Sequence, residues 1–208
     1  MTAEPGTAPA PESAPLSGHH ERRLLVVLHG HDSSPGDAAD LARRIDPGGR
    51  FAHIAPEAPY ESAGGGREWF SDTAGTLAHT QGALGSLFAE LATTSPLVVV
   101  GYSQGAAAAL ATLTSPGAPR VSAVACVSGY LGEEPGLDHE LGRLVGTAVL
   151  VQHGRHDEVV PDFLAHDLVN ALEAAGVTVT AQWFEMGHER TVESLAALTE
   201  WLAQQEGP

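Results

Sequence analysis

The chain contains no lysine, so ten arginines supply all its fixed positive charge against 26 acidic residues. The formal net charge is −16 over 208 residues. This balance argues against nucleic acid or an anionic membrane surface as a partner, because both require basic patches. No run of apolar residues reaches the roughly 18 that a membrane-spanning helix needs. We therefore expect a globular protein without stable membrane insertion, and the sequence leaves its oligomeric state open.

Cysteine is nearly absent as well. Cys126 is the only one, so no disulfide can form within the chain, and its apolar surroundings indicate a buried core residue. Large apolar side chains are scarce in residues 1–21, which also lack the basic start and apolar centre of a signal peptide. We predict a disordered tail over 1–21, one folded domain over 22–208 and a cytoplasmic location.

From residue 23 onward, short apolar runs alternate with helical patterns. The runs that indicate strands are 24–28, 51–55, 97–100, 121–127, 147–152 and 177–184. Helical segments are expected at 37–45, about 73–91 with Asp72 as N-cap, after Ser103, at 162–175 and at 192–204. Continuous apolar strands separated by helices predict an α/β fold whose parallel sheet is covered on both faces. Functional residues are expected where the carboxyl ends of the strands meet.

The third predicted strand leads directly into a Gly-x-Ser-x-Gly pentapeptide at 101–105, and an alanine-rich helix follows at once. This arrangement is typical of a nucleophile elbow, a turn so tight that only small residues fit two positions on either side of the serine. The hydroxyl of Ser103 is then exposed at the end of the strand. A serine hydroxyl is a poor nucleophile at neutral pH, so it needs a base, and the base needs an acid that orients it.

Candidates for both partners follow two later strands. Asp157 lies in the loop after the fifth strand and His188 comes directly after the sixth, which gives the order serine, acid, histidine. Two alternatives for the acid stay open: Asp157 only caps the helix that follows, or Asp162 takes its place. His153 and His156 are rival bases, but both precede or adjoin the acid, which breaks the order.

Four blocks, at 28–33, 101–105, 153–161 and 187–188, together resemble the phospholipase/carboxylesterase branch of the α/β-hydrolases, which includes the acyl-protein thioesterases. The resemblance extends from about residue 24 to the C-terminus. It implies an α/β-hydrolase fold in a minimal, lidless form, with about six parallel strands and helices on both faces. It also implies hydrolysis of a carboxylic ester, or of a thioester, through an acyl-serine intermediate, with no cofactor and no metal. The partner would be a small-molecule or lipid-like ester.

By this resemblance Ser103 attacks the acyl carbonyl, His188 takes its proton, and Asp157 holds the imidazole. The backbone N–H of Gln104, at a helix N-terminus, is well placed for the oxyanion that forms. The family pattern assigns the second oxyanion donor to the backbone N–H of His31.

Position along the chain indicates the candidate pocket residues, which are Trp69, Phe70, Leu131, Val159 and Met186. For the two aromatic residues, packing of their loop onto the core is an equal alternative.

Three other functions are alternatives to the serine hydrolase. Eleven histidines, and the His-Gly-His-Asp sequence at 29–32, suggest a metallohydrolase, but the spacing fits no common ligand motif. We interpret His29 as a support of the oxyanion loop. A lactone hydrolase similar to dienelactone hydrolase is a second alternative, although that branch typically carries cysteine at the elbow. A non-catalytic ligand-binding protein on the same fold is the third.

Overall fold

The computed structural model describes residues 23–133 and 136–205, so the tail predicted over 1–21 lies outside the described residues. Six strands form one parallel sheet in the order β2-β1-β5-β6-β7-β8. They are β1 (Leu24–Leu28), β2 (Ala52–Ile54), β5 (Leu97–Tyr102), β6 (Ala123–Val127), β7 (Ala148–Gly154) and β8 (Val179–Phe184). The sheet confirms the predicted α/β class and the number of parallel strands.

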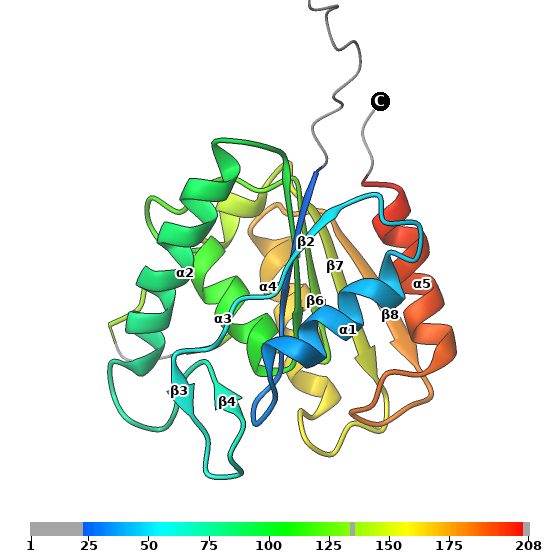
Figure 1. The fold of residues 1–208 in the computed structure, drawn as a ribbon, viewed down its shortest axis with the longest axis horizontal. Coiled ribbons are helices and arrows are strands. Elements are labelled where there is room, and N and C mark those ends of the chain that lie inside the picture. The colour runs from blue at the N-terminus through cyan, green and yellow to red at the C-terminus, as the bar shows by residue number, and fades with distance from the viewer. Residues whose placement is uncertain (1–22, 134–135, 206–208) are drawn as a thin grey trace, which may run out of the picture.

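Helices cover both faces of the sheet, as Figure 1 shows. One face carries α1 (Pro35–Ile45) and α5 (Val192–Ala203), and the other carries α2 (Thr76–Ala92), α3 (Gln104–Leu113) and α4 (Asp162–Ala174). Between β6 and β7 the described residues form one short 3-10 helix, η1 (Leu141–Leu144), in keeping with a lidless form. None of the described helices combines the length and the apolar character that crossing a membrane requires.

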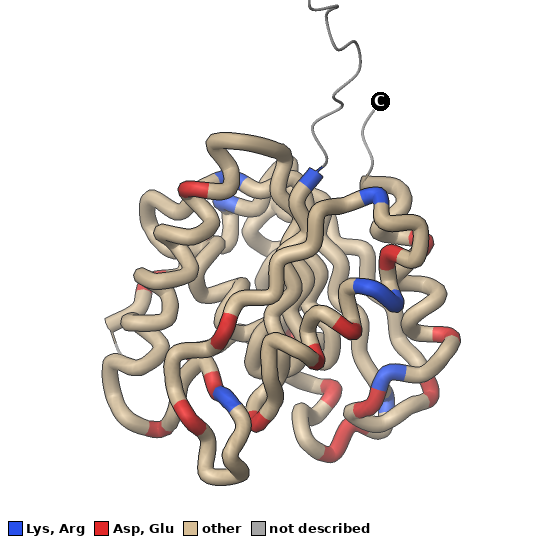
Figure 2. Tube along the Cα trace, in the orientation of Figure 1, with Lys and Arg blue, Asp and Glu red and all other residues tan. Residues whose placement is uncertain are grey.

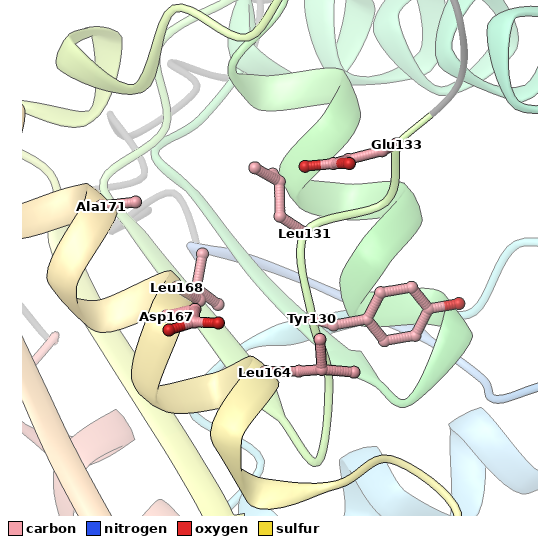
Figure 3. Close-up of a pocket in the computed structure, with 7 residues that line it drawn as sticks. All are labelled: Tyr130, Leu131, Glu133, Leu164, Asp167, Leu168 and Ala171. Carbon is pink, nitrogen blue, oxygen red and sulfur yellow. The ribbon is translucent and has the colours of Figure 1, made fainter.

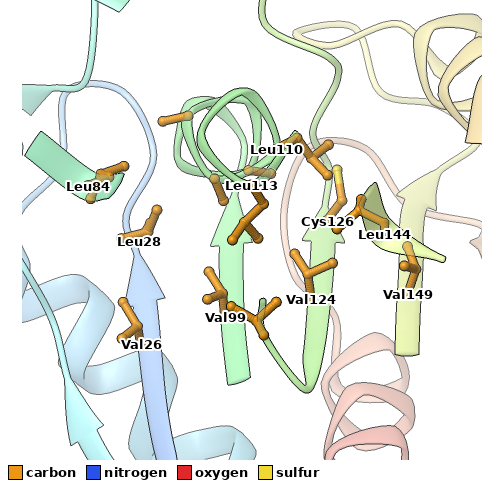
Figure 4. Close-up of a cluster of buried hydrophobic side chains, with 14 of the residues drawn as sticks. Val26, Leu28, Leu84, Val99, Leu110, Leu113, Val124, Cys126, Leu144 and Val149 are labelled. Atoms are coloured by element: carbon orange, nitrogen blue, oxygen red, sulfur yellow. The ribbon is translucent and has the colours of Figure 1, made fainter. Parts of the chain in front are cut away.

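The two cores follow from the alternation of side chains along each strand. On β1, Val26 and Leu28 belong to the cluster that also contains residues of α2, α3 and α4, whereas Leu25 and Val27 belong to the cluster that contains residues of α1 and α5. Figure 4 shows the first of these clusters, in which β1, β5 and β6 meet the alanine-rich α3. Every residue of α3 is buried, so its small side chains let the helix lie close against the sheet.

Two features of the segment between β2 and α2 differ from the sequence-based expectation. A short antiparallel ribbon forms from β3 (Tyr60–Glu61) and β4 (Arg67–Glu68), where only a glycine-rich loop was expected. The expected N-cap Asp72 is wrong, because α2 starts at Thr76 with Gly75 in the N-cap position at a φ of 84°. Strands of two residues carry no readable periodicity, which is why the pattern did not predict them.

Asp46 joins the end of α1 to β2 through a buried carboxylate. Its oxygens accept hydrogen bonds from the backbone N–H groups of Arg50 at 3.1 Å and Phe51 at 3.0 Å, and from His53 Nε2 at 2.8 Å. Burial by itself would raise the pKa of this carboxyl. The hydrogen bonds to the charged form outweigh burial, so the pKa of Asp46 lies below its ordinary value.

We predict that Asp46→Asn lowers the free energy of unfolding by about 1–3 kcal/mol at pH 7, because the buried donors lose a charged acceptor. The folded-state pKa is lowered, so the contribution of Asp46 is complete above its ordinary pKa of about 3.9 and is lost as the pH falls through the lower folded value. Urea unfolding of both proteins at pH 7 and pH 3 measures this effect. The difference between them should shrink at pH 3, and an equal difference at both pH values would contradict the assignment.

Candidate active site

Ser103 stands at the turn between β5 and α3, with a φ of 53° and a ψ of −122°. This conformation is rare for a residue with a side chain and costs about 1–3 kcal/mol, so close packing must impose it. A Cβ on Gly101 would lie 2.4 Å from the Cα of Ala106. A Cβ on Gly105 would lie 2.4 Å from the carbonyl oxygen of His29. The two glycines therefore allow the helix to turn back at once and present the serine at the end of the strand.

Side chains from two further loops meet Ser103. His188 Nε2 lies 3.0 Å from the Ser103 Oγ, and His188 Nδ1 lies 2.8 Å from the Oδ2 of Asp157. Because an N–H at Nδ1 donates to the carboxylate, the lone pair of Nε2 faces the serine hydroxyl and can accept its proton. The other carboxylate oxygen, Oδ1, accepts the backbone N–H groups of Val159 at 3.0 Å and Val160 at 2.8 Å. Asp157 therefore binds the backbone of its own loop and the imidazole of His188. The alternative that it caps the following helix is wrong, because α4 has Pro161 in the N-cap position and no side-chain cap.

The structure places the rival acid and the rival bases in other settings. Asp162 is the first residue of α4, and the Nε2 of His156 lies 2.8 Å from a carboxylate oxygen of Glu185 at the surface. His153 is fully buried, and its Nε2–H donates to the carbonyl of Val160 at 2.8 Å. The same nitrogen lies 3.4 Å from the Asp157 Oδ2, a contact that sequence reasoning missed. The one signal for it was the position of His153 at the end of a predicted strand, four residues before the acid.

The two predicted oxyanion donors belong to segments beside the serine. Gln104 follows Ser103 directly, and a Cβ on Gly30, the residue before His31, would lie 3.4 Å from the Cβ of Ser103. Within residues 23–133 and 136–205, neither the N–H of Gln104 nor that of His31 donates a backbone hydrogen bond. The side chain of Gln104 faces another loop, where its Oε1 accepts the N–H of Trp69 at 2.8 Å and its Nε2 donates to the carbonyl of Phe70 at 2.7 Å. The indole N–H of Trp69 in turn donates to the carbonyl of His29 at 2.7 Å. Trp69 thus ties its own loop to the loop that carries His31.

The β3–β4 ribbon holds the loop of His31 from outside. Ser33 and Arg67 exchange two backbone hydrogen bonds, of 3.3 Å and 2.7 Å. The imidazole of His31 extends to the ribbon, where its Nε2 lies 3.0 Å from a carboxylate oxygen of Glu68. The backbone of this loop is therefore paired with the ribbon at Ser33.

Asp32 makes the same connection through its side chain. Its φ is 53°, and its Oδ1 accepts the hydroxyl of Ser62 and the backbone N–H of Gly66, the latter at 3.0 Å. The hydrogen bond from Ser62, followed by the one from Gly66, lowers the pKa of Asp32. Gly64 leaves room for this carboxylate, because a Cβ there would lie 2.0 Å from the Oδ2 of Asp32.

The sequence His-Gly-His-Asp does not assemble into one cluster. His29 is buried, where burial lowers its pKa, and its Nδ1–H donates to the carbonyl of Gly30 at 2.8 Å. His31 and Asp32 contact different residues of the ribbon segment, as described above. In the described part of the chain, no three or more His, Cys, Asp or Glu side chains are placed to hold a metal ion.

A pocket of about 440 Å³ opens between the loop after β6 and the helix α4, as Figure 3 shows. It is lined by Tyr130, Leu131, Glu133, Leu164, Asp167, Leu168 and Ala171. Sequence reasoning missed the α4 residues, although the spacing of Leu164 and Leu168 indicates one apolar face of a helix.

Of the five predicted pocket residues, Leu131 lines this pocket and the other four lie elsewhere. Trp69 and Met186 are 1% and 3% exposed, so both are packed inside the fold. Phe70 packs half-buried against the core, and Val159 is 68% exposed.

Comparison with known proteins relates the chain to one family. The family model described as phospholipase/carboxylesterase matches residues 15–205. Among solved structures, esterase PE8 is 25% identical over 88% of this chain and 92% of its own, with a TM-score of 0.75. A carboxylesterase from Mesorhizobium loti is 25% identical over 90% of both chains, with a TM-score of 0.73. Acyl-protein thioesterase 2 from Zea mays has the same fold at 23% identity, over 92% of this chain and 96% of its own, with a TM-score of 0.73.

We predict that Gly64→Ala lowers the midpoint of urea unfolding, because the new methyl group displaces the carboxylate of Asp32. Gly82→Ala is the matched control, since a Cβ there meets nothing within 4 Å. In an Asp32→Ala background, Gly64→Ala should have little further effect, because the three nearest atoms all belong to the Asp32 side chain. Equal effects of Gly64→Ala in both backgrounds would show that the two residues are not coupled.

Proposed function

The chain belongs to the phospholipase/carboxylesterase family, and from this we propose that it is a serine hydrolase that cleaves carboxylic esters through an acyl-serine intermediate. One observation carries the proposal: the Ser103 Oγ, the two ring nitrogens of His188 and the carboxylate of Asp157 form a continuous series of contacts of 3.0 Å and 2.8 Å. A serine in this setting can be deprotonated as it attacks, which an isolated hydroxyl cannot achieve at neutral pH.

In the acylation step the Ser103 Oγ forms a bond to the carbonyl carbon of the ester while its proton moves to the Nε2 of His188. The carbonyl π electrons move onto oxygen and give a tetrahedral oxyanion. Collapse of this intermediate breaks the bond to the leaving alcohol, which takes the proton from Nε2, and the acyl group stays on the serine. The carboxylate of Asp157 holds the Nδ1–H throughout and stabilises the imidazolium that forms in between.

The oxyanion requires donors that are already in place. The backbone N–H groups of Gln104 and His31 suit this role, because neither donates a backbone hydrogen bond within the described chain. Gln104 follows Ser103 directly, and a Cβ on Gly30, beside His31, would lie 3.4 Å from the Cβ of Ser103. Gln104 also begins α3, so the positive end of the helix dipole faces the developing charge. Loss of one such donor typically costs about 3–4 kcal/mol of transition-state stabilisation.

Deacylation repeats the same sequence with water as the nucleophile. His188 takes a proton from water while the water oxygen bonds to the acyl carbon, and the proton then returns to the Ser103 Oγ as the ester bond breaks. The same two N–H groups stabilise the second oxyanion. The products are a carboxylic acid and the free enzyme, so no cofactor enters the balance.

The surroundings of the site favour an uncharged substrate with an apolar portion. Three leucines and the ring of Tyr130 line the pocket beside α4, which suits an acyl or alcohol group of moderate size. Figure 2 shows many acidic residues in the half of the molecule where the strands end, and these disfavour an anionic ester. We therefore propose a small-molecule or lipid-like neutral ester as the substrate, with thioesters as the alternative.

A fluorophosphonate probe tests the nucleophile directly. The folded protein should be labelled at Ser103, with fluoride leaving as the Oγ bonds to phosphorus, and peptide mass spectrometry locates the adduct. Ser103→Ala should abolish labelling, whereas Ser86→Ala, which changes a hydroxyl bonded within α2, should leave it intact. Absence of labelling in the folded wild-type protein would refute the proposal.

The acid is tested by a matched pair of substitutions. Asp157→Asn should lower kcat for a p-nitrophenyl ester by about 10³- to 10⁴-fold with little change in KM, because the amide no longer selects the imidazole tautomer that the reaction needs. Asp162→Asn, five residues after Asp157 and in the first turn of α4, should change kcat by less than about twofold. A larger loss from Asp162→Asn than from Asp157→Asn would reverse the assignment.

A further inference from the structure

Tyr102 ends β5 and directly precedes Ser103, so its backbone belongs to the elbow. Its ring lies against the loop that carries the second oxyanion donor, since a Cβ on Gly30 would come within 3.2 Å of the ring atom Cδ1. The ring also lies beside the imidazole of His188, with centroids 5.3 Å apart. One side chain therefore touches the nucleophile segment, the oxyanion loop and the base.

The hydroxyl of Tyr102 donates a hydrogen bond to the backbone carbonyl of His188. Burial raises the pKa of Tyr102 and the positive charge of Arg190 only partly opposes this, so the phenol keeps its proton and remains a donor. The guanidinium of Arg190 lies over the ring, 4.2 Å from its centroid. Tyr102 thus contacts the loop of residues 185–191, here called the base loop, at two points, which are the carbonyl of residue 188 and the side chain of residue 190.

Two further contacts hold the backbone of the base loop, one on each side of His188. On one side the carbonyl of Met186 accepts the N–H of His156 at 3.0 Å, and on the other Thr191 caps α5 by accepting the N–H of Ser194 at 3.2 Å. His188 lies between these anchors. The N–H of Gly187 donates to the side chain of Glu189 at 3.2 Å, a contact that stays within the same turn.

We propose that Tyr102 is a positioning residue that fixes the distance between the imidazole of His188 and the hydroxyl of Ser103. It acts through the hydrogen bond to the His188 carbonyl and the stacking of Arg190 on its ring. This inference rests on the proposed function, because it assigns Tyr102 a role in the same proton transfer. Displacement of the base by a fraction of an ångström lengthens the path of the proton and slows acylation, whereas substrate binding does not depend on it.

Tyr102→Phe tests the inference, since it removes the hydroxyl and keeps the ring that packs on Gly30 and His188. We expect kcat for a p-nitrophenyl ester to fall about tenfold with KM changed less than about twofold, and the rate of fluorophosphonate labelling at Ser103 to fall in parallel. Tyr60→Phe is the matched control, because it removes a hydroxyl that also bonds a histidine, the Nδ1 of His79 at 2.6 Å, but on the ribbon and α2. It should leave kcat within about twofold of wild type.

Thermal unfolding of both variants separates positioning from packing. A fall in kcat for Tyr102→Phe with an unfolding midpoint no lower than that of Tyr60→Phe supports the inference. Unchanged kcat and labelling rate would overturn it, and so would a rise in KM that accounts for the whole loss of kcat/KM. These outcomes differ from failure of the proposed function, in which the wild-type protein itself is neither labelled at Ser103 nor active on esters.

Discussion

The close approach of α3 to the ends of β1 and β5 is the constraint on which the site depends. At Gly105 the helix lies against the carbonyl groups of Leu28 and His29, and at Gly101 the strand lies against Ala106. No side chain larger than hydrogen fits at either contact. Two glycines without reactive groups therefore determine the position of Ser103, the proposed nucleophile. The same contact places the start of α3 beside the loop after β1, which brings both candidate oxyanion donors to Ser103.

A second close crossing joins the loops that carry Asp157 and His188, the proposed acid and base. A Cβ on Gly154, at the end of β7, would lie 2.3 Å from the carbonyl oxygen of Gly187, just after β8. Neighbouring parallel strands are held about 4.8 Å apart by their hydrogen bonds, and this crossing keeps the loops that follow them equally close. The side chain of Asp157 therefore reaches His188 while its second oxygen is still occupied by the backbone of its own loop.

Apolar runs and chain order were sufficient to predict the sheet and the order of Ser103, Asp157 and His188, because both are properties of successive strands. The β3–β4 ribbon could not be predicted in this way, because strands of two residues have no hydrophobic pattern. The turn that joins them also binds a distant side chain, the carboxylate of Asp32. Trp69 shows a second limit. Its position suggested a pocket wall or core packing. The hydrogen bond from its indole N–H to the carbonyl of His29 could not be predicted, because no spacing in the sequence indicates that partner. The α4 side of the pocket likewise depends on how one helix packs.

The pairing of β1 with β5 affects how the protein folds. Leu24 of β1 lies opposite Leu97 of β5, although α1, β2, the ribbon and α2 all separate them along the chain. Contacts between such distant segments form late and slowly during folding, because a long loop must close before they stabilise anything. Every group proposed for the reaction follows a strand of this sheet, so a partly folded chain that lacks one central pairing also lacks the site. Recovery of esterase activity after denaturation would thus follow completion of the whole sheet, later than recovery of helical structure.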